Sequence, residues 1–269
     1  MLAALIIVFR EVVEAGLIVG IVLAATEGVA HRRRWIATGV AAGLLGAAIV
    51  AAFAQRLSEA FSGTGQELFN AAILIAATVM LGWHNVWMAR HGRELSREMK
   101  ALGSSVAGGD RTLIAMAVVV AVAILREGSE VALFLFGIAA SGGEQPVSML
   151  VGGLCGVAAG ALMSWLIYRG LLAIPVGKLF SVTNWLLAFL AAGMAGQAAV
   201  FLVNANVAPP LGSQLWDTSG ILSDASLIGR ALHALAGYSD RPMGLQVLVY
   251  VLVLGTLVIA GNRLRPRVA

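Results

Sequence analysis

Long runs of apolar residues, separated by short polar connectors, dominate the chain. A membrane-spanning helix needs about 20 mostly apolar residues. Seven segments meet this length, and we predict spans over residues 2–26, 35–55, 69–89, 113–140, 147–168, 180–203 and 243–262. The first and fourth segments qualify only if three charged residues in each are tolerated. The pattern therefore predicts an all-α membrane protein with seven transmembrane helices.

The polar segment at residues 204–242 is the longest connector between the predicted spans. It contains the turn-rich stretch NANVAPPLGSQLWDTSG, followed by SLIGRALHALAGYSD, which we expect to form a short interfacial helix. At the start of the chain, Arg10 and Glu11 interrupt the apolar run where a cleavable signal peptide would continue it. We therefore expect residue 1 to begin the first membrane helix, and we expect no appended soluble domain.

The composition fits a polytopic membrane protein rather than a soluble one. The chain is 59% hydrophobic and 12% charged, whereas soluble domains are about 25% charged. The sequence pI of about 9.8 could suggest nucleic-acid binding, but the positions of the basic residues argue against it. Of the 18 Lys and Arg residues, 13 fall in the connectors after spans one, three and five and in the C-terminal tail: Arg32, Arg33, Arg34, Arg90, Arg93, Arg97, Lys100, Arg111, Arg169, Lys178, Arg263, Arg265 and Arg267. Basic residues gather on the cytoplasmic side of membrane proteins, so we predict an outside N-terminus and a cytoplasmic C-terminus.

The connectors predicted to lie outside are acidic, with Glu59, Glu67, Glu144, Asp217, Asp224 and Asp240. Negative charge at this face would raise the local concentration of cations. Glu67, Asp217 and Asp224 are candidates for an outer uptake site, and His233 could help to gather metal there. Ordinary loop and helix-capping roles are the alternative for all four residues.

Two spans carry the same three charges. The first contains FREVVEAG, with Arg10, Glu11 and Glu14, and the fourth contains LREGSEVA, with Arg126, Glu127 and Glu130. Residues three or four apart share one face of a helix, so each span presents two carboxylates with an arginine beside one of them. Ionised groups at this depth cost at least ~2.5–3.5 kcal/mol each on insertion scales, so they should face the bundle interior and have partners.

An internal duplication accompanies these charges. Arg10 and Arg126 are 116 residues apart, and GVAAG occurs at 39–43 and again at 156–160, an offset of 117. We predict two three-helix repeats, residues 1–112 with a cytoplasmic loop and residues 113–203. The outer loop at 204–242 and a seventh helix with its tail at 243–269 follow. Three helices is an odd number, so the second repeat is inverted, an arrangement that places transporter sites near the membrane midplane.

The chemistry of the charged residues favours a hard cation as their ligand. Each triplet sums to −1, and carboxylate oxygens bind hard cations without any soft Cys or Met cluster. Glu11, Glu14, Glu127 and Glu130 are therefore the candidate metal ligands, supported by Arg10 and Arg126. The alternative is a buried ion-pair network between the two helices, but it leaves Glu11 and Glu127 as excess negative charge. His84 could ligate metal or relay protons, although a packed histidine is the simpler interpretation.

The doubled Arg-Glu-x-x-Glu pattern resembles the oxidase-dependent iron permease family, which includes fungal iron permeases and bacterial inner-membrane permeases of the Efe uptake system. The resemblance covers most of the chain, including FREVVEAGLIVGI, GQELFNAAI, LREGSEVALFLFGI and LHALAGYSDRP. The two motifs here read Val12-Val13 and Gly128-Ser129 where the family commonly has Gly-Leu. The resemblance implies seven helices and assigns iron transport to the six charged residues. It also implies a partner, which is a multicopper oxidase in fungi and periplasmic iron-handling proteins in bacteria.

These observations together predict a high-affinity iron permease of the cytoplasmic (inner) membrane. Iron is its substrate, and we expect no cofactor and no nucleic-acid partner. One alternative is a permease for another metal such as manganese or lead, because oxygen ligands discriminate weakly among such ions. A proton-coupled solute carrier using the glutamates as a relay is a second alternative. The sequence has no Gly-x-Ser-x-Gly and no His-Glu-x-x-His, so an intramembrane enzyme is disfavoured.

Overall fold

The computed structural model describes residues 1–60, 65–109, 111–140, 145–170 and 176–263. Within these ranges, the side chains of residues 57–60, 85, 88–93, 95, 96, 176–181, 227, 234 and 261–263 are not described. Glu144, Arg265, Arg267 and the side chains of Glu59, Arg90, Arg93, Lys178 and Arg263, which entered the charge argument, therefore lie outside the described part.

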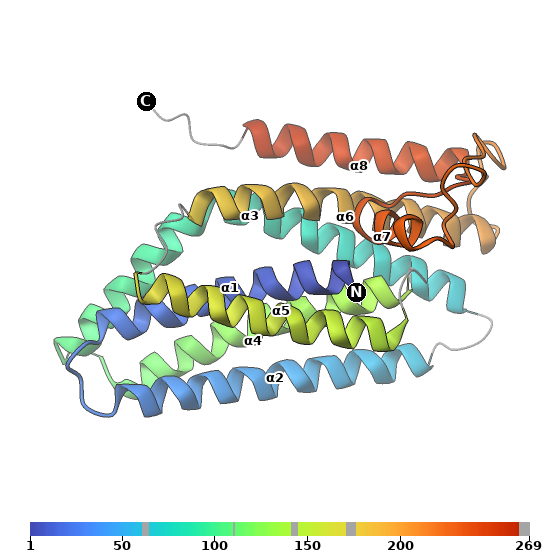
Figure 1. The fold of residues 1–269 in the computed structure, drawn as a ribbon. Coiled ribbons are helices and arrows are strands. Elements are labelled where there is room, and N and C mark those ends of the chain that lie inside the picture. The colour runs from blue at the N-terminus through green and yellow to red at the C-terminus, as the bar shows by residue number, and fades with distance from the viewer. Residues whose placement is uncertain (61–64, 110, 141–144, 171–175, 264–269) are drawn as a thin grey trace.

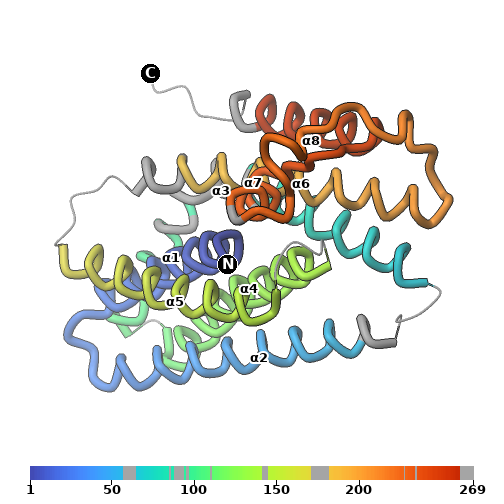
Figure 2. Tube along the Cα trace, turned by 45° about the vertical axis from the view of Figure 1, so that its right-hand side comes forward, coloured from blue at the N-terminus to red at the C-terminus, as the bar shows by residue number. Residues whose placement is uncertain are grey.

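The described chain is helical and contains no strand. The helices are α1 (Leu2–Ala25), α2 (Arg32–Ala60), α3 (Gln66–Ala107), α4 (Leu113–Ala140), α5 (Pro146–Tyr168), α6 (Val176–Asn204), α7 (Leu227–Ala236) and α8 (Gly244–Arg263). They form an elongated bundle in which α1 lies between α2 on one side and α8 on the other (Figures 1 and 2). The all-α prediction is confirmed, and α7 is the short helix expected in the long connector.

Helix α3 corrects the predicted boundaries. The third span was expected to end at residue 89 in a polar connector, but α3 continues to Ala107 and is 42 residues long. At 1.5 Å per residue such a helix is about 63 Å long, roughly twice the thickness of the hydrocarbon core. Glu94, Arg97, Glu98 and Lys100 are exposed charged residues, so this part of α3 belongs outside the apolar layer.

Among the described residues, four helical segments are long and apolar enough to cross a membrane: Arg32–Arg56, Gln66–His84, Pro146–Tyr168 and Val182–Asn204. The segment Gly244–Ala260 is a shorter apolar helix. Helices α1 and α4, with 24 and 28 residues, also exceed the length needed to span a membrane, but each carries a charged triplet. The fold is thus that of an integral membrane protein.

The strongest helix contacts join helices that are distant in the sequence. Helix α2 packs chiefly on α4, and α5 packs chiefly on α1, whereas α1 and α2 barely touch. Glycines allow both close approaches. A Cβ atom built at Gly43 would lie 2.6 Å from the carbonyl oxygen of Ala121, and one built at Gly156 would lie 2.7 Å from that of Leu5. These glycines belong to the two GVAAG sequences, which therefore serve the same purpose in two different helix pairs.

Two apolar clusters fill the bundle on either side of the charged triplets. One contains Ile7 of α1 and Phe134 of α4, which are fully buried together with residues of α3 and α6. The other contains Val22 of α1 and Val120 of α4. Because the charged triplets lie between these residues on both helices, the polar site is enclosed at both ends by packed hydrocarbon.

The segment between α6 and α8 covers the end of the bundle that holds the N-terminus (Figure 1). Helix α7 within it begins at the cap Ser226, whose hydroxyl accepts a hydrogen bond from the backbone N–H of Gly229 at 2.9 Å. It ends at Gly237, which adopts the left-handed conformation with φ of 66°. Ser and Gly are the residues favoured at these two positions, so the local sequence fixes both ends of this short helix.

Candidate metal site

The charged triplet of α1 is almost completely buried. Arg10 and Glu11 are each 1% exposed, and Glu14 is 4% exposed. The Nη2 atom of Arg10 lies 2.9 Å from Glu14 Oε1, which confirms the expected pairing across one helical turn. Arg10 Nη1 also lies 2.9 Å from Glu11 Oε1, so the expectation that Glu11 would lack an arginine partner is wrong. One guanidinium therefore serves two carboxylates.

The triplet of α4 has the same sequence spacing but a more open environment. Arg126 Nε lies 3.1 Å from Glu130 Oε1 and 3.7 Å from Glu127 Oε1. The Arg126 side chain is 36% exposed, and its guanidinium carbon lies 4.7 Å from the ring centre of Trp87 on α3. The second motif thus shares its arginine with an aromatic ring, and Glu127 is held less tightly than Glu11.

His84 of α3 joins the two motifs. Its Nδ1 lies 2.6 Å from Glu130 Oε2, and its Nε2 lies 3.3 Å from Glu14 Oε2. The ring is 3% exposed. Sequence spacing could place His84 at membrane depth but could not show which charged groups it meets, because that contact depends on how α3 packs against α1 and α4.

Four of these residues form a cluster with the geometry of a metal site. One ligand atom each from Glu11, His84, Glu127 and Glu130 lies within 4.8 Å of all the others, and this is the one such cluster in the described part of the chain. Around an ion with four tetrahedral bonds of about 2.1 Å, the ligand atoms are about 3.4 Å apart, so these side chains would have to move closer together to bind one ion. The Oε2 atoms of Glu11 and Glu127 have no hydrogen-bond partner.

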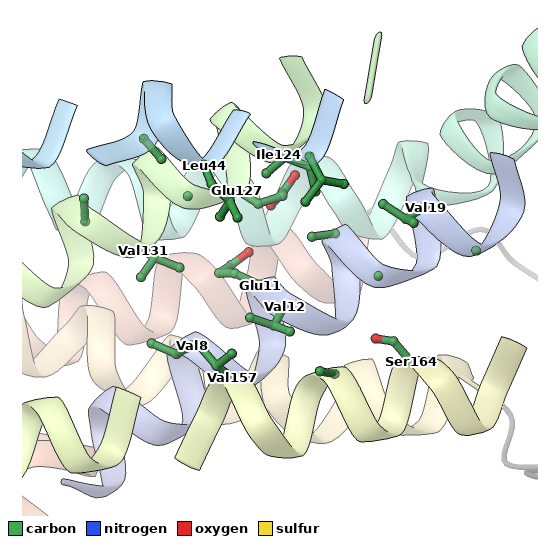
Figure 3. A pocket seen from close by; sticks show the side chains of 18 of the residues that line it. Val8, Glu11, Val12, Val19, Leu44, Ile124, Glu127, Val131, Val157 and Ser164 are labelled. Atoms are coloured by element: carbon green, nitrogen blue, oxygen red, sulfur yellow. The ribbon is translucent and has the colours of Figure 1, made fainter. Parts of the chain in front are cut away.

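Cavities adjoin the cluster on two sides. The larger, of about 700 Å³, lies between α1, α2, α4 and α5 and is apolar apart from a few groups such as Glu11, Glu127 and Ser164. The two carboxylates point into it from α1 and α4 (Figure 3). The smaller cavity, of about 400 Å³, is lined by His84, Arg126 and Glu130. Glu11 and Glu127 therefore line the larger pocket, and His84 and Glu130 line the smaller one.

The candidates for an outer uptake site lie apart from this cluster. Glu67 is exposed in the first turn of α3. Asp217 Oδ1 accepts hydrogen bonds from the hydroxyl and the backbone N–H of Ser219, which lower the pKa of Asp217 to about 2. Its Oδ2 lies 3.1 Å from Arg241 Nε.

Asp224 and His233 have structural partners within the connector between α6 and α8. Asp224 and Asp240 each accept a hydrogen bond from the backbone N–H of the other. Partial burial raises the pKa of Asp224 above its ordinary value. His233 Nδ1 lies 2.7 Å from the carbonyl oxygen of Tyr238. These contacts shape the connector and do not gather the acidic groups into a single ligand set.

Comparison with known proteins gives a consistent result. Residues 1–263 match the description "Iron permease FTR1 family". The chain is 28% identical over 258 residues to proteins named ferrous iron permease EfeU from Escherichia coli O6:K15:H31 and from Shigella sonnei, covering 94% of this chain and 92% of each relative. It is 28% identical over 203 residues to the protein of that name from Shigella flexneri, covering 75% and 86%. No solved structure matches the chain significantly.

Proposed function

Because the chain belongs to the iron permease FTR1 family, we propose that it is a high-affinity iron permease that moves iron ions into the cell through the Arg-Glu-x-x-Glu motifs of α1 and α4. The observation that carries this proposal is the buried cluster of Glu11, Glu127 and Glu130 with His84. Buried carboxylates are costly in a membrane, so those that are retained usually have a function. A transported cation explains why this chain retains four of them.

The glutamates replace part of the hydration shell of the ion. Each of the four glutamates has at least one oxygen without a hydrogen-bond partner, and in Glu11 and Glu127 it is Oε2, so these atoms are available to a cation. Arg10 and Arg126 reduce the repulsion among the four carboxylates when no ion is bound. An ion that binds Glu11 and Glu127 must draw together α1 and α4, and its release must let them separate.

Two inverted three-helix repeats, residues 1–112 and 113–203, are the proposed basis of this movement. Helix α1 of the first repeat packs on α5 of the second, and α2 of the first repeat packs on α4 of the second. Each contact is made close by the glycines of a GVAAG sequence, which supports a duplicated design. The two pairs face one another across the cavity that contains Glu11 and Glu127. Seven spans, an outside N-terminus and a cytoplasmic C-terminus in the inner membrane complete the proposed topology, and the basic residues at one end of the bundle favour it.

The outer face is proposed to concentrate iron rather than to coordinate it tightly. Glu67, Asp217 and Asp224 add negative charge at the end of the bundle that holds the N-terminus. The carboxylate oxygens of Asp217 and Asp224 already accept hydrogen bonds, so these residues act mainly through their charge. A periplasmic protein that oxidises or delivers iron is the proposed partner at this face.

Iron uptake into liposomes that contain the purified protein tests the proposal. Radioactive Fe²⁺, kept reduced, and Fe³⁺ held by a weak chelator are supplied in separate experiments, and empty liposomes give the background. We expect wild-type protein to accumulate iron and the Glu11→Gln and Glu127→Gln variants to lose more than about tenfold of the uptake rate, since even groups that only support a metal ligand contribute about 10–100-fold in affinity.

Glu27→Gln is the matched control, because Glu27 is exposed in the turn after α1. It should transport iron as the wild type does. Uptake by wild-type protein no faster than by empty liposomes, with either form of iron, would refute the permease proposal. Normal uptake by both glutamine variants at the motifs would refute the site.

A further inference from the structure

His84 has contacts that its sequence position does not explain. It comes from α3, outside both charged motifs, yet its ring lies between Glu14 of α1 and Glu130 of α4. The side chain is 3% exposed. If His84 served only to fill space between helices, its two ring nitrogens would not need to contact Glu14 and Glu130.

The two ring nitrogens have different environments. Nδ1 lies 2.6 Å from Glu130 Oε2 and 3.4 Å from Arg126 Nη2, and the shorter of these two distances suits an Nδ1–H that donates to the carboxylate. Nε2 lies 3.3 Å from Glu14 Oε2 but has no hydrogen-bond partner. In metal sites, a carboxylate commonly binds one nitrogen of a ligating imidazole and thereby directs the other nitrogen towards the ion. His84 and Glu130 have this arrangement.

His84 also borders space that an ion can reach. Together with Arg126 and Glu130 it lines the cavity of about 400 Å³, and a ligand atom of His84 lies within 4.8 Å of ligand atoms of Glu11 and Glu127. The ring is thus positioned at the boundary of the cluster rather than deep within an apolar core.

We propose that His84 is a ligand of the transported ion through Nε2, oriented by Glu130, and that it selects transition-metal ions over alkaline-earth ions. This inference rests on the proposed permease function and deepens it. Carboxylate and carbonyl oxygens alone suit Mg²⁺ and Ca²⁺, whereas imidazole nitrogen suits iron, zinc, copper and nickel. One nitrogen added to an oxygen ligand set changes the class of ion that is bound best.

The direct test is X-ray absorption spectroscopy at the iron edge of the purified wild-type protein loaded with Fe²⁺ without oxygen. Scattering typical of an imidazole ring should be present in wild-type protein and absent in His84→Gln. Glutamine keeps a polar side chain but returns the site to oxygen ligands. His233→Gln is the matched control, because His233 of α7 contacts the carbonyl oxygen of Tyr238, which follows that helix, and it should keep the imidazole signal.

Competition measures the selectivity. Excess Mg²⁺ or Ca²⁺ should not inhibit iron uptake by wild-type protein but should inhibit uptake by His84→Gln, whose half-saturating iron concentration should rise by about 10–100-fold. A histidine that merely braced Glu14 and Glu130 would lower uptake without changing which ions compete.

The two proposals fail in different ways. Iron uptake at wild-type level without an imidazole signal would overturn the assignment of His84 and leave the permease function standing. Absence of any iron uptake would overturn the permease function itself. Even where His84→Gln does not fold, the absence of an imidazole signal from wild-type protein overturns the assignment of His84.

Discussion

One carboxylate oxygen of Glu11 lies within 4.8 Å of one carboxylate oxygen of Glu127, although the residues are 116 positions apart in the sequence. Both side chains enter the same cavity from opposite helices. Two like charges at this separation repel one another in a medium of low polarity. A cation between them converts that repulsion into attraction, which makes this pair the part of the site that changes most on ion binding.

Replacement of the two arginines should have unequal effects. Arg10 contacts Glu11 and Glu14 and is 1% exposed, whereas Arg126 is 36% exposed. We expect Arg10→Ala to lower the free energy of unfolding by about 3–5 kcal/mol, as removal of one partner of a buried ion pair does, and Arg126→Ala to lower it by clearly less. Thermal unfolding in detergent with a monodispersity assay measures both. Equal losses would contradict the structural difference between the motifs.

Lysine is a further test at Arg10. Guanidinium is a planar fork that can hold two carboxylates at once, whereas ammonium is a compact point charge. We expect Arg10→Lys to insert into the membrane, as the wild type does, but to lose most iron transport per folded molecule. Arg126→Lys should also lose transport, but to a smaller extent, because the Arg126 guanidinium is partly exposed and also contacts the Trp87 ring. Near-normal transport by Arg10→Lys would show that Arg10 stabilises the helix packing and is not needed to shape the transport site.

The ring of Trp87 should matter more than that of its neighbour Trp83. Trp87 lies under the Arg126 guanidinium, a contact that contributes about 0.5–2 kcal/mol, whereas Trp83 is 72% exposed. We expect Trp87→Leu to reduce iron uptake several-fold and Trp83→Leu to have little effect in the same liposome assay. The reverse order would show that the cation–π contact does not position Arg126.

Two glycines of α5 make a matched pair for helix packing. A Cβ atom at Gly156 would lie 2.7 Å from Leu5 oxygen, whereas one at Gly153 would have its nearest neighbour at 4.0 Å. We expect Gly156→Ala to cost about 1–3 kcal/mol of stability through overpacking. Gly153→Ala should be neutral or slightly stabilising, because alanine is the better helix former. Denaturation of the two variants in detergent checks the difference.

Charge at the outer connector should affect uptake only when iron is scarce. We expect Asp217→Asn to raise the half-saturating iron concentration by less than about threefold at low salt, with no effect at about 1 M salt, where screening acts over about 3 Å. Because the pKa of Asp217 is about 2, the carboxylate stays ionised as the pH falls from neutrality to about 4, so the low-salt effect should persist over that range. A salt-independent loss of transport would instead indicate a direct ligand.

The sequence allowed accurate prediction of the helices that apolar runs define. The predicted fourth span, 113–140, coincides with α4, and the predicted first span differs from α1 by one residue at its end. The end of α3 was missed because hydropathy detects only the part of a helix that lies in hydrocarbon. The stretch RELSREMKAL consists largely of strong helix formers, and that signal could have extended the prediction.

The site was only partly predictable. Spacing along one helix predicted the pairs Arg10–Glu14 and Arg126–Glu130, because both partners belong to the same helix. Contacts between helices, such as those of His84 with Glu14 and Glu130, depend on the rotation and depth of α3. Arg10 also contacts the adjacent Glu11, which helical periodicity did not predict, because neighbouring residues do not share a helix face.

The packing of α1 on α5, and of α2 on α4, also has a consequence for the order in which helix contacts can form during synthesis. Helix α1 leaves the ribosome first, but its main neighbour α5 begins at Pro146, long after α1 has been synthesised. The newly made α1 thus carries three charges, and the face that later packs on the glycines of α5 has no partner until α5 has been synthesised. Contacts between such distant segments form late. A chain interrupted before α5 therefore lacks the main packing partner of α1.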